Sequence, residues 1–406
     1  MRVLWLTPEL PSPLGAGGAL RQWHMLGRLV AHGHEPVVVA PVHPGEREGA
    51  ERLRAAGVDL RAYERPPSRV AETLGLVRRR PALVPAALAE PLVAWQCDAF
   101  WTALEPLARG ALEEGPFEVV NVNHDWAAGW VRRLPLGRAA RVLTLENLTW
   151  SYYANRARAA AGPRAALLAA EARRWLRYDR RRFSDYDALV TVSEHDAELA
   201  ARETSTRTVA IPSGVDTRAL APPPERDGGD PALIFTGNMR WPPNAEAVRW
   251  LLREVWPRVR DRVPSARVLA VGADPPPDVL ALAGERVEVP GRVPELEPWF
   301  ERASIVVIPI LSGAGIRLKV LDALASGRAV VSTTMGAEGA QVTDGEHLVI
   351  ADDPREFADA VVRLLEDPGE RRRLGAAARR LAEERYDWRA LGDRFEALVS
   401  ELGAGR

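Results

Sequence analysis

Short apolar runs alternate with longer helical stretches along most of the chain. In the first half, the runs predict strands at residues 2–7, 35–40, 58–63, 119–123, 141–146, 188–193 and 208–211. Helical patterns lie between several of them, ending near residue 32 and covering residues 85–114 and 155–183. Strands that alternate with helices are typical of parallel α/β sheets.

Proline and glycine crowd together at residues 221–230 without apolar periodicity, which indicates a domain boundary. The α/β pattern then restarts, with strands predicted at residues 232–236, 267–271, 287–289, 305–308 and 329–332 and helices at 244–263 and 316–326. The sequence thus predicts two Rossmann-like domains, residues 1–220 and 221–385. Ligands of such sheets bind outside the carboxyl ends of the strands, so residues just after strands are the candidates for chemistry.

The composition is that of a folded protein, with 47% apolar and 27% charged residues among 406. The net charge of −1 gives no reason to expect a nucleic-acid partner. Cys97 is the only cysteine, which excludes an internal disulfide and a cysteine-based zinc site and fits the cytoplasm. The first apolar run ends at Pro8, and no run approaches the roughly 18 residues of a membrane span. We therefore expect a cytoplasmic protein without a membrane-spanning segment.

The segment at residues 309–331 carries the strongest functional pattern. It follows an apolar strand and enters a helix, and Gly313 and Gly315 allow a ligand to approach the backbone closely. Arg317 and Lys319, the only lysine of the chain, lie in the first helical turn. Two cations at the start of a helix oppose its dipole unless an anion lies between them, so the pattern indicates a diphosphate site. The alternative is an ordinary strand–loop–helix with surface charges.

Asp322 lies one turn beyond Lys319, where its carboxylate can bind ribose hydroxyls. The whole segment resembles the donor-binding motif of glycosyltransferase family 4, in the branch that reads G-x-G-x-R-x-K-x-x-E-A. Further segments that match this branch are residues 211–216, 235–244, 333–339 and 344–345. The resemblance implies a GT-B fold, a nucleoside-diphosphate sugar as donor substrate, retention of anomeric configuration, and neither a metal nor another cofactor. The donor-binding residues that it implies are Gly313, Gly315, Ile316, Asp322, Gly237 and Arg240.

Three positions depart from the family pattern. Asp322 stands where the family usually has Glu, so its carboxylate reaches about one methylene less far, which bears on donor affinity. Ala314 stands where the wider family has a second Glu, which leaves the sugar hydroxyls to other groups such as the backbone amides near residues 313–316. Ser213 replaces the usual Asn of P-N-G-V-D.

The first half offers a glycine-rich loop after its first strand. Gly17 and Gly18 allow close approach of a phosphate or an acceptor, and Arg21 is a further candidate phosphate contact. The second strand ends without an acidic residue for a ribose hydroxyl, which argues against NAD. By resemblance the loop faces the interdomain cleft of a GT-B protein. The alternative is a tight turn between strand and helix.

His124 follows the strand at residues 119–123. A lone histidine is more often structural, but in the resembled family a histidine near this position commonly contacts the donor sugar. Asp125 is an alternative helix cap. The D-x-D pair Asp185 and Asp187 precedes a strand instead of following one, so we interpret it as a structural feature and not as a metal site.

The stretch from Arg164 to Arg182 contains seven arginines interspersed with large apolar residues. Two interpretations stay open: a solvated helix face, and a peripheral contact with an anionic membrane surface or a lipid-phosphate acceptor. The second would place the protein at the inner face of the membrane. By resemblance, residues 386–406 form a helix that crosses back to the first domain.

The sequence thus favours a glycosyltransferase whose Arg317 and Lys319 stabilise the leaving diphosphate, while Asp322 binds the ribose and His124 the donor sugar. The partners expected are a nucleotide sugar and a sugar, lipid-linked or small-molecule acceptor. Two alternatives remain: a nucleotide-sugar epimerase on the same fold, which needs paired carboxylates or a base, and a degenerate nucleotide-binding module without turnover.

Overall fold

A computed structural model describes residues 1–15, 17–65, 91–220, 231–312 and 318–405. The chain forms two compact units. The first comprises Met1–Ser213 together with Leu391–Arg406, and the second comprises Gly214–Ala390. The chain therefore passes between the units twice, and the predicted boundary segment at residues 221–230 lies outside the described residues.

The first unit is built on a seven-stranded sheet in the order β3-β2-β1-β4-β5-β6-β7, whose neighbouring strands are all parallel. Its strands are β1 (Arg2–Leu6), β2 (Glu35–Val42), β3 (Asp59–Glu64), β4 (Val119–Asn123), β5 (Ala140–Leu145), β6 (Ala188–Thr191) and β7 (Arg207–Ala210). Trp5 of the central strand β1 lies opposite Val38 on one side and Asn121 on the other. The sequence therefore predicted every strand of this sheet, to within a few residues.

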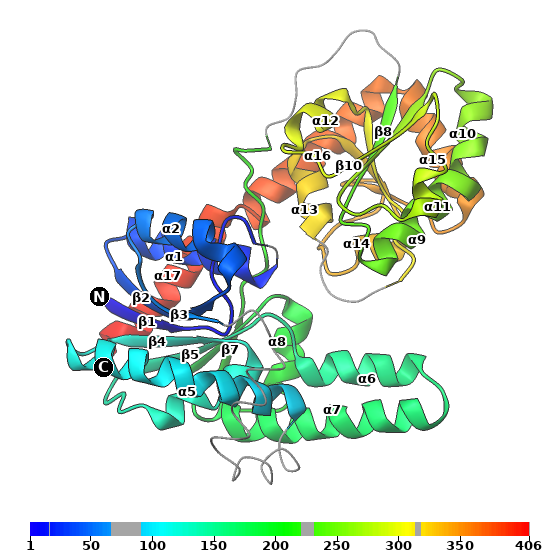
Figure 1. The fold of residues 1–406 in the computed structure, drawn as a ribbon. Coiled ribbons are helices and arrows are strands. Elements are labelled where there is room, and N and C mark those ends of the chain that lie inside the picture. Colours follow the sequence, from blue (N-terminus) through cyan, green and yellow to red (C-terminus); the bar gives the residue numbers. More distant parts are fainter. Residues whose placement is uncertain (16, 66–90, 221–230, 313–317, 406) are drawn as a thin grey trace. The chain divides into compact units, whose positions relative to one another are not determined.

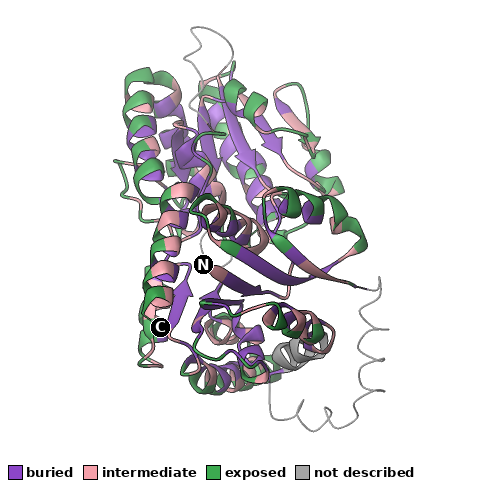
Figure 2. Ribbon diagram, turned by 90° about the vertical axis from the view of Figure 1, so that its left-hand side faces the viewer, coloured by how far each residue is buried: buried purple, intermediate pink, exposed green. Residues whose placement is uncertain are grey.

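Helices cover this sheet, with buried residues on their inner faces and exposed residues outside (Figure 2). The helices of the unit are α1 (Gly18–Ala31), α2 (Arg47–Ala55), α5 (Leu92–Glu113), α6 (Thr149–Ala159), α7 (Gly162–Phe183), α8 (Glu194–Ala201) and α17 (Trp388–Ala404), with 3-10 turns η1 (Pro44–Glu46), η2 (Asp125–Ala127) and η3 (Trp130–Arg133). The helical stretch predicted at residues 155–183 is helical apart from a break that the sequence analysis did not predict. Two helices, α6 and α7, lie side by side (Figure 1), and Gly162 at φ 62° makes the turn between them.

The terminal helix α17 packs within the first unit. Its Asp393 Oδ1 accepts a hydrogen bond from Arg28 Nε at 2.8 Å, and the ring of Phe395 meets that of Trp5 edge-on at 5.6 Å between centroids. Arg394 Nη2 donates to the carbonyl of Ala210 at 2.9 Å. These contacts tie α17 to helix α1 and to strands β1 and β7, so the end of the chain completes the first unit.

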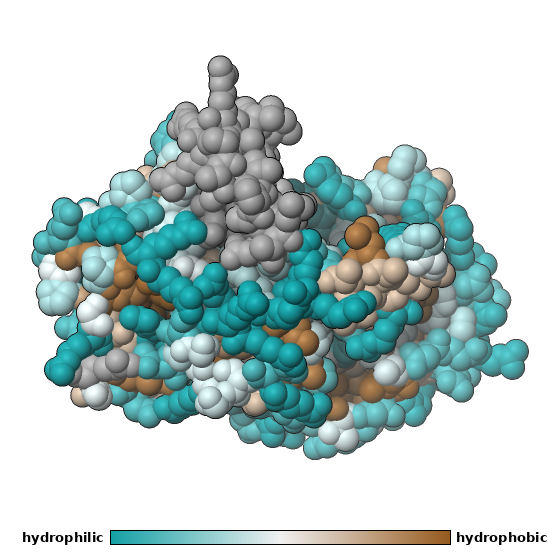
Figure 3. Space-filling view, turned by 90° about the horizontal axis from the view of Figure 1, so that it is seen from below, coloured by the Kyte–Doolittle hydropathy of each residue, from teal (hydrophilic) through white to brown (hydrophobic). Residues whose placement is uncertain are grey.

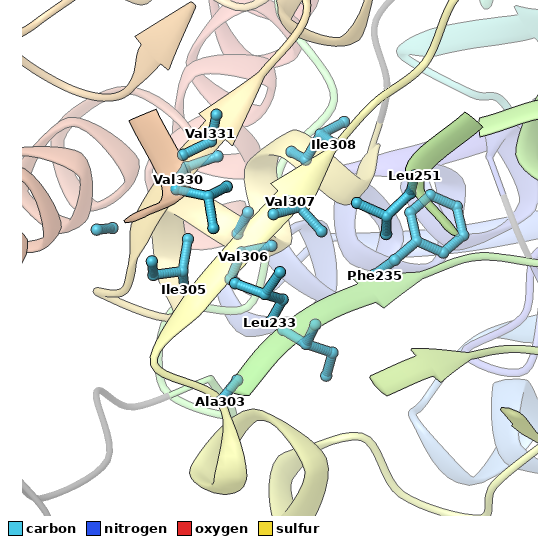
Figure 4. Close-up of a cluster of buried hydrophobic side chains, with 14 of the residues drawn as sticks. Leu233, Phe235, Leu251, Ala303, Ile305, Val306, Val307, Ile308, Val330 and Val331 are labelled. Atoms are coloured by element: carbon cyan, nitrogen blue, oxygen red, sulfur yellow. The ribbon is translucent and has the colours of Figure 1, made fainter. Parts of the chain in front are cut away.

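The second unit has a six-stranded parallel sheet in the order β10-β9-β8-β11-β12-β13. Its strands are β8 (Ala232–Thr236), β9 (Arg267–Val271), β10 (Val287–Gly291), β11 (Ile305–Ile308), β12 (Ala329–Ser332) and β13 (Val349–Ile350). Figure 4 shows side chains of β8, β11 and β12, among them Leu233 and Val307, together in the buried core. The sequence predicted five of these strands and missed β13, which has only two residues.

The helices of the second unit are α9 (Pro242–Trp250), α10 (Trp256–Arg262), α11 (Pro277–Leu280), α12 (Glu297–Arg302), α13 (Leu318–Ala325), α14 (Thr334–Ala337), α15 (Pro354–Glu366) and α16 (Pro368–Arg385), with a π-helical segment η4 (Leu251–Val255) between α9 and α10. Among the helices within the described ranges, none combines the length and apolar character that a membrane span requires. Each unit thus consists of a parallel sheet with helices packed against it, which confirms the predicted α/β fold class.

Candidate active site

The carboxyl ends of β8 and β9 meet helix α13 at one edge of the second sheet. Lys319, in the first turn of α13, donates a hydrogen bond from Nζ to Asn244 Oδ1 at 2.5 Å. The same ammonium lies 4.4 Å from the centroid of the Phe235 ring, at the end of β8. A cation over an aromatic face and beside an amide oxygen is held in one place, so the structure fixes the position of this charge.

Gly237 makes room for the ammonium. A Cβ at this position would lie 2.7 Å from Lys319 Nζ and 2.9 Å from Asn244 Nδ2, closer than a Cβ atom approaches other heavy atoms. Gly272 serves the same purpose one strand away, because a Cβ there would lie 1.9 Å from the carbonyl oxygen of Gly237. Two glycines thus let the loops after β8 and β9 approach each other and the lysine.

Asn244 is buried in the first turn of α9. Its Nδ2 donates to the carbonyl of Asn238 at 2.7 Å, which leaves Oδ1 directed at Lys319. The amide therefore orients the ammonium. Asn244 is the last residue of the segment 235–244, which matches the family pattern. That match is the one sequence signal of its role.

Asp322 is half-buried one turn beyond Lys319. Burial raises the pKa of its carboxyl group to about 7, against the opposing effect of the Lys319 charge. Near neutral pH this carboxyl group therefore exists in both protonation states, so it can donate or accept a hydrogen bond.

Three of the predicted donor-binding residues, Gly313, Gly315 and Ile316, and the predicted catalytic residue Arg317 lie outside the described residues. Arg240 is exposed over 80% of its side chain, and its Nε pairs with the carboxylate of Asp274 at 3.2 Å. Of the predicted residues in this unit, the structure therefore brings together Gly237, Lys319 and Asp322, and it adds Asn244 and Phe235.

The first unit places His124 directly after β4. The residue is buried and has φ 72°, an uncommon backbone conformation for a residue with a side chain. Its Nε2 lies 3.1 Å from Glu9 Oε1, and its ring meets that of Trp126 edge-on at 4.5 Å. Burial alone would lower the pKa of His124, but the hydrogen bond and the charge of Glu9 outweigh it, so the pKa is raised.

Glu9 belongs to a chain of hydrogen bonds that starts inside the sheet. Trp5 Nε1 donates to Gln22 Oε1 at 3.0 Å, and Gln22 Nε2 donates to Glu9 Oε1 at 2.8 Å. The same carboxylate oxygen contacts His124. No sequence pattern points to Glu9, because only the folded sheet brings the loop after β1 to the end of β4.

Arg21 is buried on α1 and is held by protein groups. Its Nη1 donates to the carbonyl of Pro212 at 2.7 Å, and its Nε lies 3.7 Å from Glu146 Oε1. Burial lowers the pKa of Arg21 and raises that of Glu146, while their mutual attraction opposes both shifts. In this structure the guanidinium predicted as a phosphate contact therefore neutralises Glu146.

The predicted glycine loop begins helix α1 at this same edge. Gly17 has φ 58° and precedes the helix without a side-chain cap. A Cβ on Gly18 would lie 2.5 Å from Glu9 Oε1 and 3.1 Å from Glu146 Cγ. The loop thus allows two carboxylates to lie close to the helix start, beside His124.

The family model for glycosyl transferases group 1 matches residues 230–367, which include Gly237, Asn244, Lys319 and Asp322. Over these residues, which lie in the second unit, the chain is similar to that family. The phosphatidyl-myo-inositol mannosyltransferase of Mycolicibacterium smegmatis is 29% identical over 209 residues, 48% of this chain and 53% of that one. The chain thus spans about half the length of this and similar curated relatives.

A second relative matches this chain along most of its length. The GDP-mannose-dependent alpha-(1-6)-phosphatidylinositol monomannoside mannosyltransferase of the same organism is 27% identical over 403 residues, 92% of each chain. Among solved structures, Anabaena Alr3699/HepE in complex with UDP aligns with a TM-score of 0.65 and 13% identity, covering 99% of this chain and 100% of that one. The fold is therefore GT-B.

The D-x-D pair of this chain, which precedes β6, has structural partners. Asp185 accepts hydrogen bonds from Arg132 Nε at 2.6 Å and Nη2 at 2.8 Å, and Asp187 accepts one from the backbone N–H of Arg141 at 2.8 Å. Asp125 likewise accepts hydrogen bonds from Thr149 N and Oγ1, at the start of α6. Within the described ranges, no group of three His, Cys, Asp or Glu side chains is arranged to hold a metal ion.

Proposed function

We propose that this protein is a retaining, metal-independent glycosyltransferase that moves a sugar from a nucleoside-diphosphate sugar to an acceptor. The observation that carries the proposal is the fixed Lys319 ammonium, directed by Asn244 at the carboxyl end of β8. The match to the glycosyl transferases group 1 model and the mannosyltransferase relatives support sugar transfer as the reaction. Structures of Anabaena HepE with UDP and with UDP-glucose support a nucleotide sugar as the donor.

In this proposal Lys319 stabilises the charge that develops on the leaving diphosphate. An ammonium has three N–H groups, and Asn244 accepts from one of them, which directs the others. A positioned cation is already oriented when the sugar–phosphate bond breaks, so it lowers the barrier without reorganisation. Arg317, two residues earlier, is proposed to supply the second charge, in place of a divalent metal.

The chemistry needs no protein nucleophile. The bond between the anomeric carbon and the phosphate oxygen breaks, and the acceptor oxygen forms its bond on the same face of the sugar. The acceptor's proton passes to the leaving phosphate, so charge and atoms balance. His124, held by Glu9, is proposed to donate a hydrogen bond to the donor sugar from its protonated ring.

Asp322 is proposed to bind the ribose. A carboxyl group with a pKa of about 7 accepts a hydrogen bond from a hydroxyl group when it is ionised and also donates one when it is neutral. Both states bind a diol, but the ionised state binds it more strongly, because charge-assisted hydrogen bonds are the stronger ones. Donor affinity should therefore increase as pH rises through about 7.

A second function, epimerisation of a nucleotide sugar, is supported by one observation. Glu9 and Glu146 both lie beside His124, which is the paired-carboxylate arrangement that such a reaction needs. The Arg21–Glu146 pairing favours a structural role for the second carboxylate. Incubation with a nucleotide sugar and no acceptor separates the two functions, because only an epimerase converts the donor into its epimer, which NMR detects.

The binding step of the proposal is tested by a thermal-shift panel. UDP, GDP, ADP and dTDP are compared with and without magnesium, for the wild type, Lys319→Ala and the exposed control Arg253→Ala. A ligand at a hundred times its Kd stabilises the folded state by about 2.7 kcal/mol. The proposal predicts that one nucleotide shifts the wild type and the control without magnesium, and that the shift is reduced or lost in Lys319→Ala. No shift with any nucleotide would point instead to a protein that does not bind these donors.

A further inference from the structure

Helices α6 and α7 form a hairpin with an unusual concentration of positive charge. The two helices contain nine arginines and two acidic residues, a formal charge of +7 in a chain whose net charge is −1. One of the acidic residues, Asp179, is buried, so only Glu171 remains near the surface to offset the arginines. The rest of the chain therefore has a negative net charge, opposite to the positive net charge of the hairpin.

Most of these arginines face solvent. The exposed ones are Arg156, Arg158, Arg164, Arg173, Arg177, Arg180 and Arg181. Arg180 pairs with Glu203, whereas Arg173 and Arg177 donate to the backbone carbonyls of their own helix and form no ion pair with any described residue. A surface of this kind attracts an anionic partner through its summed field as well as through single pairs.

The hairpin also exposes apolar surface beside this charge. Leu167 is 72% exposed and Tyr152 is 46% exposed, whereas hydrophilic side chains occupy much of the face that Figure 3 shows. An open groove of about 620 Å³ lies between the helices, with Trp150 and Leu176 in its lining. Arg158 and Arg173, one from each helix, line the groove as well. Cationic and apolar groups thus line the same groove.

The hairpin is fixed to its unit by its inner side. Trp175 and Phe183 of α7 are fully buried in the core of the first unit, and Tyr178 is buried between them. Asp125 accepts hydrogen bonds from Thr149 at the start of α6. The outer side is therefore a preformed surface, and a partner does not have to order it on binding.

We propose that the α6–α7 hairpin docks on an anionic lipid bilayer, with its arginines at the headgroups and Leu167 inserted at the boundary with the acyl chains. The positive charge favours an anionic partner, because a second copy of the same face would carry the same charge and be repelled. The exposed Leu167 and the apolar groove favour a bilayer over a nucleic acid. A nucleic acid offers phosphates but no apolar layer in which Leu167 could be buried. Interfacial helices that combine arginines with large apolar residues bind membranes in this way.

This docking does not depend on the proposed reaction, so its test needs no substrate. The full-length protein is sedimented with vesicles of phosphatidylcholine alone and with vesicles containing phosphatidylglycerol, at low and at physiological salt. Binding should require phosphatidylglycerol and weaken as salt rises. The double variant Arg158→Glu/Arg173→Glu should lower the partition coefficient by about tenfold or more. The control Arg54→Glu/Arg138→Glu makes the same change of net charge at exposed positions outside the hairpin and should bind as the wild type does.

Leu167→Ser separates a bilayer from other anionic partners. It removes an exposed side chain and should leave the melting temperature unchanged while reducing binding to vesicles. Equal binding of the wild type and Leu167→Ser, or equal loss in the hairpin and control charge variants, would overturn the proposal. The proposal would also be overturned if the wild type bound a soluble acidic polypeptide or DNA but did not bind vesicles that contain phosphatidylglycerol.

Discussion

The ammonium of Lys319 lies 2.5 Å from the side-chain oxygen of Asn244, 75 residues earlier in the chain. The other end of the amide is anchored on the carbonyl of Asn238, so Asn244 cannot turn without breaking a hydrogen bond. The contact joins α9 to α13 at the carboxyl edge of one sheet. It gives the only lysine of the chain a defined direction.

Asn244→Ala should therefore reduce turnover through Lys319. We expect kcat to fall by about tenfold, because the ammonium loses the hydrogen-bond acceptor that orients it and therefore stabilises the charge of the transition state less well. Asn155→Ala, at an exposed asparagine of α6, serves as the matched control. Steady-state kinetics with melting curves on the same samples provide the measurement. A variant that only melts earlier, with kcat unchanged at 25 °C, would show that Asn244 is purely structural.

Gly237→Ala tests the same geometry by adding one methyl group. The new Cβ would meet Lys319 Nζ at 2.7 Å, and the end of a flexible side chain moves aside more cheaply than backbone does. We predict that Gly237→Ala folds but displaces the ammonium, with a loss of turnover similar to that of Lys319→Ala. A double-mutant cycle checks this, because the two losses should be far from additive. Full additivity would mean that Gly237 acts independently of Lys319.

Glu9→Gln should change the dependence of stability on pH. The folded-state pKa of His124 is raised above its unfolded value, so protonation of this histidine stabilises the fold. That stabilisation is fully present below the unfolded pKa of about 6.5 and is lost as pH rises through the folded-state pKa. Glu9→Gln should therefore destabilise the protein more at about pH 6 than at about pH 9 in denaturant titrations. An equal effect at both values would contradict a charged Glu9–His124 pair.

Asp322→Asn should stabilise the protein at alkaline pH. The folded-state pKa of Asp322 is about 7, well above the unfolded value near 3.9, so ionising this carboxyl group costs folding free energy as pH rises from about 4 to about 7. The asparagine removes that cost, so we expect the variant to be stabilised more at pH 8 than at pH 4. Melting temperatures across this range check the sign. The same variant should raise KM for the donor, because it removes the ionised acceptor for the ribose.

Much of the fold was predictable because each strand is a local apolar run. The two-domain α/β organisation follows from such runs, and so do twelve of the thirteen strands in the part of the chain that the structure describes. The break between α6 and α7 was missed because alanines surround it and favour helix, while the turn depends on the backbone of Gly162. β13 was missed because its two residues carry no periodicity.

The candidate site was predictable only in part, for a different physical reason. Lys319, Asp322 and His124 carry a local signal, since each follows a strand or opens a helix. Asn244 and Glu9 act on these residues through contacts 75 and 115 residues apart in sequence, which only the folded sheets create. Arg21 also carries a local signal, but its burial against Glu146 is a tertiary property.

The most direct test of the account is sugar transfer by the wild type and Lys319→Ala in the presence of EDTA. GDP-mannose and UDP-glucose serve as donors with a panel of sugar and lipid-linked acceptors, and NMR determines the anomeric configuration of the product. The account predicts transfer with retention from one donor without metal, and a loss of about a hundredfold or more in Lys319→Ala. Inverted product, a requirement for a divalent metal, or unchanged turnover by Lys319→Ala would contradict it.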